Sequence, residues 1–419
     1  MSETDDRTTS VAVDGDRLLA RLARLAKIGS SRSGGVTREA YGPLDVEARD
    51  LVAGWMRDAG LAVEVDAAAN LIGRRPGPSG RWLATGSHLD TVVDAGPFDG
   101  AFGAVAGVEV AAALRGVESM EHGLMVVAFA NEEGARGSDG MVGSRALVGE
   151  VPDGELSGVD DGGVSLDERL IDAGGDPGLL ADARWDVGEI DAFVELHVEQ
   201  GPVLDEAEES LGVVLGITGR QAVDIVLRGA PNHAGTTPMH LRVDAMAAAA
   251  ELVLAIEAMA RDGGVRVATC GHLHVRPNVR NVIPGEAFLS AELRDDDLAR
   301  LGDGRALVEG LVAEVDGLRG TTGELTWGQL VEPVDAHPDV VAAVRAAAEA
   351  SGRPWRTMWS GAGHDAQILG RHLPMGMIFV PSVGGVSHAP EETTDPEHLV
   401  LGAQVLADTL VALDGRGVG

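Results

Sequence analysis

Short apolar runs, each bounded by turn residues, recur in the N-terminal part of the chain at positions 61–65, 70–74, 82–87 and 123–130. Runs of this length and composition are typical of strands buried inside a sheet. An Ala/Val-rich segment at 100–114 lies between the last two runs and has the composition of a buried helix. Strands that alternate with helices predict an α/β domain, here with a mixed sheet covered by helices.

The pattern changes after Gly201. Two long helical segments, 244–260 and 301–318, are then interleaved with about four strand-like runs. This order fits a small α+β sandwich of the split βαβ, ferredoxin-like kind. The earlier alternation resumes with a helix at 339–350 and a strand at 375–380. We therefore expect a small domain inserted into a larger one, with the larger domain at 13–211 and 329–416 and the insertion at 212–328.

The surface charge limits the choice of partners. The chain has 419 residues and a formal net charge of −33, and Lys27 is its only lysine. Nucleic acid is excluded as a partner, because phosphate binding needs a basic face. A carboxylate-rich surface with almost no lysine resembles that of proteins from high-salt cytoplasm, so we expect a halophilic, salt-requiring protein.

The apolar stretches and the cysteine count limit the cellular location and the kind of metal site that we expect. No stretch approaches the roughly 18 uncharged residues of a membrane span, so no membrane partner is expected. Residues 1–16 are polar and acidic and lack the features of a secretory signal peptide, which predicts a frayed tail and a cytoplasmic protein. A single cysteine, Cys270, excludes an internal disulfide framework and any multi-thiolate zinc site. Metal ligands, if present, must be His, Asp and Glu.

Polar residues suited to metal binding follow the apolar runs. The segment GSHLDTVVDAGPFDGAFG carries His88, Asp90 and Asp99, although a lone His-x-Asp is weak evidence because each residue could be a satisfied loop group. Glu132 and Glu133 stand together at the end of the next run. Ligands of open α/β sheets bind at the C-terminal ends of the strands. Two adjacent carboxylates at such an end therefore favour a functional role.

The same arrangement recurs in two further strands, one that delivers His197 and one that leads through glycines to His388. The resulting set of strand-end residues is His88, Asp99, Glu132, Glu133, His197 and His388. This mixture of imidazole and carboxylate suits zinc, manganese, cobalt or nickel. Six such residues can hold two divalent ions about 3.5–4 Å apart, with one carboxylate as a bridge and another free to act as a base.

The motifs resemble those of one enzyme family. They are GGVTREAY, GSHLDTV with PFDGAFG, NEEGAR with MVGSRAL, ELHVEQGPVL, HAGTTPM, PNVRNVIPG, SGAGHDA and IFVPSVGGVSHAPEE. Together they are similar to the family of carbamoylases, ureidopropionases and allantoate amidohydrolases, among the dinuclear aminoacylase-like metallohydrolases. The resemblance runs from Gly34 to Glu392. It implies hydrolysis of a carbamoyl C–N bond, two bound divalent ions, and a dimerisation or lid role for the inserted domain.

The resemblance also implies roles for individual residues in the larger domain. His88 and Glu133 would each ligate one ion, and Asp99 would bridge the two. His197 would complete the shell of one ion and His388 that of the other. Asp90 would accept the second ring proton of His88, as carboxylates behind a metal ligand do. Glu132 would be the general base that takes a proton from water and returns it to the leaving nitrogen.

Further residues would contact the substrate, according to the same resemblance. His233, from the inserted domain, would reach the site of a partner subunit and stabilise the oxyanion. Asn281 and Arg294 would clamp the substrate carboxylate, for which the planar guanidinium is suited. Gln200 and His364 would contact the substrate from the larger domain. The role of His233 requires a homodimer, expected to be isologous.

Several readings of the activity stay open. The first is hydrolysis of an N-carbamoyl-L-amino acid, and its nearest rivals act on allantoate or β-ureidopropionate. A metallopeptidase or aminoacylase on the same scaffold and a non-catalytic binding protein are more distant alternatives. Two departures from the family pattern, at Ala95-Gly96-Pro97 and at Gly137, could reshape the rim of the pocket. Neither touches an expected ligand or the base.

Overall fold

The computed structural model describes residues 11–117, 120–134, 138–152, 154–159 and 162–416. Gly137, one of the two departures from the family pattern, lies outside these ranges. The chain folds into two compact units, one formed by Met1–Gly216 with Asp335–Gly419 and the other by Ile217–Val334. The predicted limits of the insertion, 212 and 328, stay a prediction.

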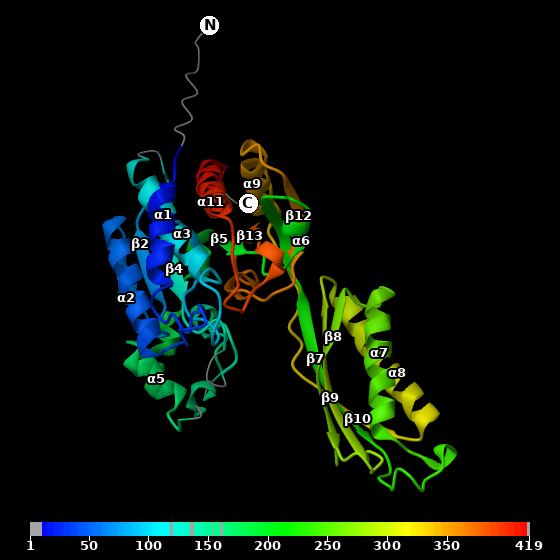
Figure 1. Cartoon of the computed structure of the whole chain (residues 1–419). Helices are drawn as coiled ribbons and strands as arrows, with labels where there is room; N and C mark the ends of the chain where they lie inside the picture. Colours follow the sequence, from blue (N-terminus) through cyan, green and yellow to red (C-terminus); the bar gives the residue numbers. More distant parts are fainter. Residues whose placement is uncertain (1–10, 118–119, 135–137, 153, 160–161, 417–419) are drawn as a thin grey trace. The chain divides into compact units, whose positions relative to one another are not determined.

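The first unit is built on a nine-stranded sheet (Figure 1). Its path runs β1-β2-β4-β3-β5-β13-β6-β11, with β12 paired to β6. The strands are β1 (Ala62–Val65), β2 (Leu71–Arg75), β3 (Trp82–His88), β4 (Gly123–Phe129), β5 (Ile190–Val198), β6 (Leu211–Ile217), β11 (Val334–Asp335), β12 (Trp355–Ser360) and β13 (Met375–Val380). The central strands β4, β3, β5 and β13 are parallel, whereas β1, β2 and β6 pair antiparallel. The sheet is therefore mixed, and its four parallel strands end at one common edge.

Helices cover this sheet because its strands are apolar on both faces, as the burial of every residue in β4 shows. The α-helices of the unit are α1 (Gly15–Leu25), α2 (Pro43–Asp58), α3 (Ala101–Ala113), α4 (Val142–Val148), α5 (Leu166–Asp172), α6 (Val203–Glu206), α9 (Pro338–Ala350), α10 (Asp365–Leu369) and α11 (Pro396–Arg416). The central helix α3 packs on β3, β4 and β5 and is covered in turn by α1, α2 and α11. Such a helix must be apolar on all sides, which explains its Ala/Val-rich sequence.

One residue of α3 is an exception to this apolar character. Glu109 is fully buried and accepts hydrogen bonds from Arg17 and Arg21 of α1 and from the backbone N–H of Asp14.

The prediction of a frayed tail is wrong for the part that is described: Val11 is buried, and its carbonyl accepts a hydrogen bond from Gln404 at 2.7 Å. These contacts are long-range, so the local composition gave no sign of them.

The last helix, α11, was not expected from the sequence pattern. It is the one helix among the described residues that is long and apolar enough to cross a membrane, judged by length and composition only. Half of its apolar window is buried inside the molecule, and it packs on α3, α9, β5 and β13. Its apolar character is therefore accounted for by its place in the core.

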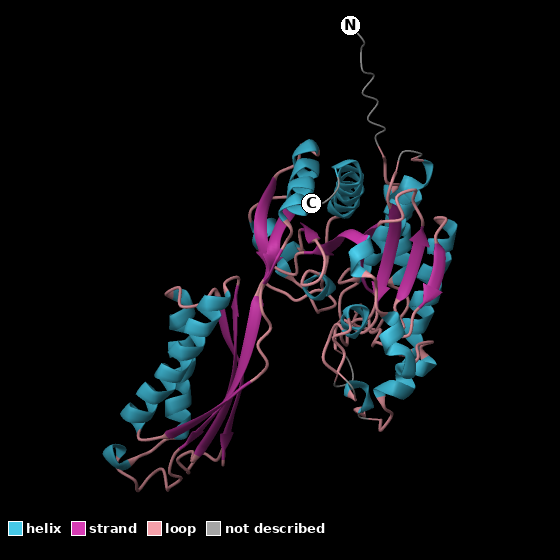
Figure 2. Ribbon diagram, turned by 180° about the vertical axis from the view of Figure 1, so that it is seen from behind, coloured by secondary structure: helices cyan, strands magenta, loops and turns pink. Residues whose placement is uncertain are grey.

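The second unit is a four-stranded antiparallel sheet with two helices on one face (Figure 2). Its elements are β7 (Gly219–Arg228), α7 (Ala245–Arg261), β8 (Val267–Arg276), β9 (Glu286–Asp295), α8 (Leu298–Arg319) and β10 (Thr322–Trp327). The strand order β10-β7-β9-β8 is that of the predicted split βαβ sandwich. Buried and exposed residues alternate along β7, and its buried side chains pack against α7 and α8. Asp244 and Asp297 cap the two helices by accepting backbone N–H groups.

Candidate metal centre

The parallel strands of the first unit bring the predicted residues to one edge. In the register of the sheet, His88 at the end of β3 lies opposite Phe129 of β4, and His197 of β5 lies opposite Phe379 of β13. Glu132 and Glu133 follow β4 after two residues, and His388 follows β13 after a short loop. The alternation of apolar strand and polar strand end is therefore sufficient to gather these side chains in space.

Three backbone conformations at this edge are uncommon for residues with a side chain. Asn131, Gln200 and His388 all have positive φ angles, of 54°, 59° and 54°. Left-handed residues of this kind are stabilised only by their surroundings and concentrate at functional sites. Each of the three stands at, or one residue away from, a predicted site residue.

The first ligand group consists of His88, Asp99 and His197, which are all buried. Asp99 Oδ1 lies 3.3 Å from His197 Nε2 and 3.8 Å from His88 Nε2. The opposite ring nitrogens contact backbone carbonyls, with His88 Nδ1 2.9 Å from the oxygen of Asp90 and His197 Nδ1 2.8 Å from that of Val198. A backbone carbonyl can only accept a hydrogen bond, so Nδ1 carries a proton in both rings. The lone pair of Nε2 is then the one that could bind a cation.

The second group consists of Asp99, Glu133 and His388. Here the other carboxylate oxygen is used: Asp99 Oδ2 lies 3.0 Å from His388 Nε2, which is 3.7 Å from Glu133 Oε2. The side chain of His388 is 48% exposed, so this group is open to small molecules. Asp99 thus belongs to both groups and presents one oxygen to each, which is the arrangement of a bridging carboxylate.

Glu132 lies beside the first group without belonging to either. Its Oε2 is 3.8 Å from His88 Nε2, and its side chain is only 9% exposed. Burial, followed by the charges of Asp365 and Glu133, raises the pKa of Glu132 well above its usual value. A carboxyl group with a strong tendency to hold a proton is suited to proton transfer.

Asp90 is placed differently from the expectation. Its carboxylate is 3.8 Å from His88 Nδ1, whereas its own backbone carbonyl makes the hydrogen bond to that ring. The carboxylate instead accepts the backbone N–H groups of Glu132 and Glu133, at 3.3 and 3.2 Å. Asp90 therefore fixes the loop that carries both glutamates, while its backbone orients His88.

The donor set fits a pair of divalent cations by several tests. The carboxylate oxygen Oε1 of Glu133 is buried and has no hydrogen-bond partner within the described chain, as expected for a group that needs a cation. Gly100 leaves space for the His88 ring, since a Cβ there would lie 2.3 Å from its Nε2. The donors are imidazole and carboxylate only, the mixture that zinc, manganese and related ions accept.

The pKa values of the site residues lead to the same conclusion. Burial favours the neutral form of Asp99, but hydrogen bonds from His197 and His388 outweigh it and hold the pKa of Asp99 well below its usual value. Burial lowers the pKa of His197, yet Asp99 raises it to about 9. The hydrogen bond to Asp99 likewise raises the pKa of His388 to about 9, and burial raises that of Glu133 to about 8. Protons therefore occupy positions from which a cation could displace them.

The predicted substrate residues of the first unit lie next to these groups. Gln200 Nε2 donates to Asp99 Oδ2 at 3.0 Å, and its buried Oε1 has no partner among the described residues. His364 is 2% exposed, its ring centroid is 4.7 Å from that of His197, and its Nε2 contacts Ser360 Oγ at 3.0 Å. A contact of His364 with substrate stays a prediction.

The remaining three predicted residues belong to the second unit. His233 is exposed, and its Nδ1 accepts the backbone N–H groups of Gly235 and Thr236, at 3.0 and 3.2 Å. The proton is thereby assigned to Nε2, so His233 can act as a hydrogen-bond donor. The backbone of Asn281 accepts from Ala234, so the loops that carry His233 and Asn281 lie together. Arg294, on β9, donates through Nε to Glu292 at 2.7 Å.

Comparison with known proteins identifies the family. The family model described as peptidase family M20/M25/M40 matches residues 84–412, a range that includes every residue of both groups. The chain belongs to peptidase family M20/M25/M40. The carbamoylase resemblance drawn from the motifs and the predicted fold class are both confirmed.

Relatives within the M20/M25/M40 family extend over nearly the whole chain. An N-carbamoyl-L-amino acid amidohydrolase from Geobacillus stearothermophilus is 43% identical over 405 residues, covering 95% of this chain and 98% of the relative. An allantoate amidohydrolase from Bacillus subtilis (strain 168) is 36% identical over 400 residues, covering 93% and 95%. The crystal structure of an amidase of the hydantoinase/carbamoylase family from Burkholderia multivorans has a TM-score of 0.90 at 37% identity, covering 96% of this chain and 98% of that one.

Three buried carboxyl groups of this M20-family protein were not predicted from the sequence. Glu195 accepts from Ser87 Oγ and from the backbone of Ala366, at 2.8 and 3.0 Å, and Asp365 accepts from Ser144 Oγ at 2.6 Å. Glu392 lies against the turn that carries Asp99. The signal for Glu195 was present, since it stands two residues before His197 and so on the same face of an apolar strand.

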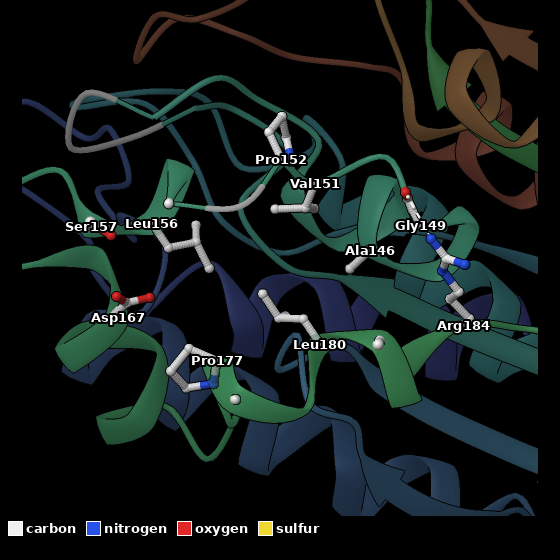
Figure 3. A pocket seen from close by; sticks show the side chains of 13 residues that line it. Ala146, Gly149, Val151, Pro152, Leu156, Ser157, Asp167, Pro177, Leu180 and Arg184 are labelled. Carbon is white, nitrogen blue, oxygen red and sulfur yellow. Dashed lines mark hydrogen bonds between the residues drawn. The ribbon is translucent and has the colours of Figure 1, made fainter.

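A separate cavity of about 520 Å³ lies within the first unit (Figure 3). Its lining lies between Ala146 and Arg184, and the side chains of Val151, Leu156 and Leu180 face the cavity from different sides. None of the ligands of either group lines it. Its lining includes the charged side chains of Asp167 and Arg184 but no histidine, so it offers none of the imidazole and carboxylate combinations found at the strand-end site.

Proposed function

We propose that this protein hydrolyses the carbamoyl group of N-carbamoyl-L-amino acids to the amino acid, ammonia and carbon dioxide. It is a hydrolase of carbon–nitrogen bonds other than peptide bonds. The observation that carries the proposal is the shared position of Asp99, one oxygen of which faces His88 and His197 and the other His388. The likeness to N-carbamoyl-L-amino acid amidohydrolases supports the choice of substrate.

The residues suited to hold the cations divide into two sets. His88 and His197 would bind one ion with Asp99, and Glu133 and His388 would bind the other with the same Asp99. Zinc or manganese fits these donors, and cobalt or nickel is an alternative. When bound, two such ions polarise the carbamoyl carbonyl and lower the pKa of water.

The chain's own groups would perform the proton transfers. Glu132 would take a proton from the attacking water and deliver it to the nitrogen that leaves, so that the C–N bond breaks without release of an unstable anion. Asp90 holds the backbone of Glu132 in place by accepting its N–H. The exposed edge at His388 would admit the substrate to this site.

The substrate carboxylate would be bound by side chains of the second unit. Arg294 and Asn281 carry suitable donors, and Nε2 of His233 would stabilise the oxyanion from a partner subunit. Gln200 and His364 would contact the substrate beside the cations. This assignment requires a homodimer, which we include in the proposal together with a cytoplasmic location and dependence on high salt.

A second candidate is an allantoate amidohydrolase, supported by the 36% identity to the Bacillus subtilis relative. β-Ureidopropionate is a third substrate of the same ureido-acid class, and both candidates keep the mechanism unchanged. Peptidase or aminoacylase activity and a non-catalytic binding role are further from these relatives. All residues proposed as ligands and the proposed base are present, which argues against a binding protein.

A substrate panel tests the proposal. Ammonia release is measured with N-carbamoyl-L-amino acids, allantoate, β-ureidopropionate and dipeptides, with each of the four metals at high salt. We expect hydrolysis of ureido acids and loss of that activity in Glu132→Gln with the metal content retained. Cleavage of dipeptides without action on any ureido acid would refute the proposed substrate class.

A further inference from the structure

We propose that Glu392 is a positioning residue that ties the turn carrying Asp99 to the segment carrying His388, and thereby supports one of the two cation positions selectively. The inference rests on the proposed dinuclear function. Glu392 lies between β13 and α11 and is only 3% exposed.

The contacts of Glu392 join two segments that are distant in the sequence. Its Oε1 accepts the backbone N–H groups of Phe98 and Asp99, at 2.9 and 3.1 Å. Its Oε2 accepts the hydroxyl of Ser387 at 3.0 Å. One carboxylate therefore holds the backbone of the proposed bridging aspartate and the residue next to His388. Because both oxygens already accept hydrogen bonds, Glu392 is placed to hold ligands in position and not to be one.

The turn is shaped to receive this carboxylate. A Cβ at Gly96 would lie 2.3 Å from the Cβ, Cδ and Oε1 of Glu392, so only glycine lets the turn close over it. Gly96 is part of the Ala95-Gly96-Pro97 departure from the family pattern. The close approach means that Glu392 has little room to move, and the two N–H groups of the turn are held against it.

The selectivity follows from the two oxygens of Asp99. Oδ1 faces His88 and His197, whereas Oδ2 faces His388. Ser387, held by Glu392, also reaches Oδ2, at 3.4 Å. Glu392 thus hydrogen-bonds the backbone of Asp99 and the side chain of Ser387, and within the described chain no hydrogen bond or ion pair joins it to His88 or His197. Loss of Glu392 should therefore weaken binding of the ion at Glu133 and His388 more than binding of the ion at His88 and His197.

The effect is measured as metal affinity, without reference to turnover. Metal-free protein is titrated with Co²⁺ against a chelator of known affinity, and bound ions are counted by elemental analysis. Wild type should bind two ions. Glu392→Ala should bind one ion with wild-type affinity and the second about 10–100-fold more weakly, the loss typical of groups that orient a metal ligand.

Two variants separate positioning from general stability. Glu392→Gln keeps an oxygen for the two N–H groups and an amide for Ser387, so it should restore binding of the second ion. Glu391→Ala removes the adjacent but exposed carboxylate and should bind both ions like wild type. Circular dichroism checks the fold of each variant. If Glu392→Ala does not fold, Ser387→Ala provides the test, with weakening of the second ion alone expected.

The outcomes distinguish this inference from the proposed function. Wild type that binds fewer than two ions contradicts the dinuclear proposal, and the inference falls with it. If wild type binds two ions, and Glu392→Ala binds both with wild-type affinity or binds both equally weakly, the proposed role of Glu392 is overturned. The dinuclear proposal then stands. The His388→Ala variant serves as reference, because its remaining ion should match the one kept by Glu392→Ala.

Discussion

Gly100 offers the sharpest test of how the backbone shapes the metal site. It has a φ of 61°, and a Cβ there would lie 2.3 Å from Nε2 and Cε1 of His88, where ordinary contact begins near 3.4 Å. Alanine at this position must push the ring by about 1 Å, a displacement that can lower turnover by about 100-fold at a catalytic site. The positive φ, combined with a ψ of −49°, lies outside the left-handed helical region and should also destabilise the fold, by at least about 1–2 kcal/mol.

A matched control isolates the contact with His88 from backbone strain. Gly352 has a similar φ of 67°, but a Cβ there would meet no atom within 4 Å. In denaturant unfolding, Gly352→Ala should therefore show only the loss due to backbone strain, and Gly100→Ala should lose at least as much. Only Gly100→Ala should lose ammonia release and affinity for the first ion. Wild-type activity and two tightly bound ions in Gly100→Ala would refute the proposed role of His88 and the space reserved for it.

Further predictions address the base, the protons, the buried ion pair and salt. Glu132→Gln should lower kcat by about 10²–10⁴-fold while elemental analysis still finds the wild-type metal content, and normal turnover would exclude Glu132 as the base. Because the pKa values of His197 and His388 are raised to about 9 in the metal-free protein, loading with Zn²⁺ at pH 7 should release protons, and affinity should increase as the pH rises toward 9. Calorimetry in buffers of different ionisation enthalpy measures this release, and pH-independent affinity would contradict it. Glu109→Ala should lower the free energy of unfolding by about 2–3 kcal/mol, less than for a fully buried pair because one arginine partner is 42% exposed. Glu251→Ala, which removes a surface ion pair, should leave the free energy of unfolding almost unchanged. Equal losses in Glu109→Ala and Glu251→Ala would contradict a special contribution of the buried pair. Dialysis into very dilute buffer should lower Tm and activity, since the charge of −33 is then unscreened, and an unchanged Tm would contradict a halophilic protein.

The sequence predicted most of the fold because the relevant signals are local. The strand predicted at 375–380 matches β13 (Met375–Val380), and the helix predicted at 339–350 begins one residue late. Strand ends could be located in this way, so the gathering of His88, His197 and the two glutamates at one edge followed from the pattern. Local patterns also gave the order of strands and helices in the second unit.

Other features depend on contacts that no local pattern contains. The hydrogen bond from His88 to the carbonyl of Asp90, in place of its carboxylate, is decided by the path of the loop. Glu392 stands beside the exposed Glu391 in the sequence, and only the fold brings it to the turn of Asp99. Helix α11 is different, because its apolar residues are clear in the sequence and a local pattern could have predicted it; only its packing on α3 and α9 is a long-range feature.

In the proposed site, Asp99 would bridge two divalent ions held by the strand ends. Anomalous diffraction from crystals grown with Zn²⁺ or Mn²⁺ would locate both ions. We expect two peaks about 3.5–4 Å apart, one beside Oδ1 with His88 and His197 and the other beside Oδ2 with Glu133 and His388. A single peak, or two peaks of which one lies away from Asp99, would contradict the claim.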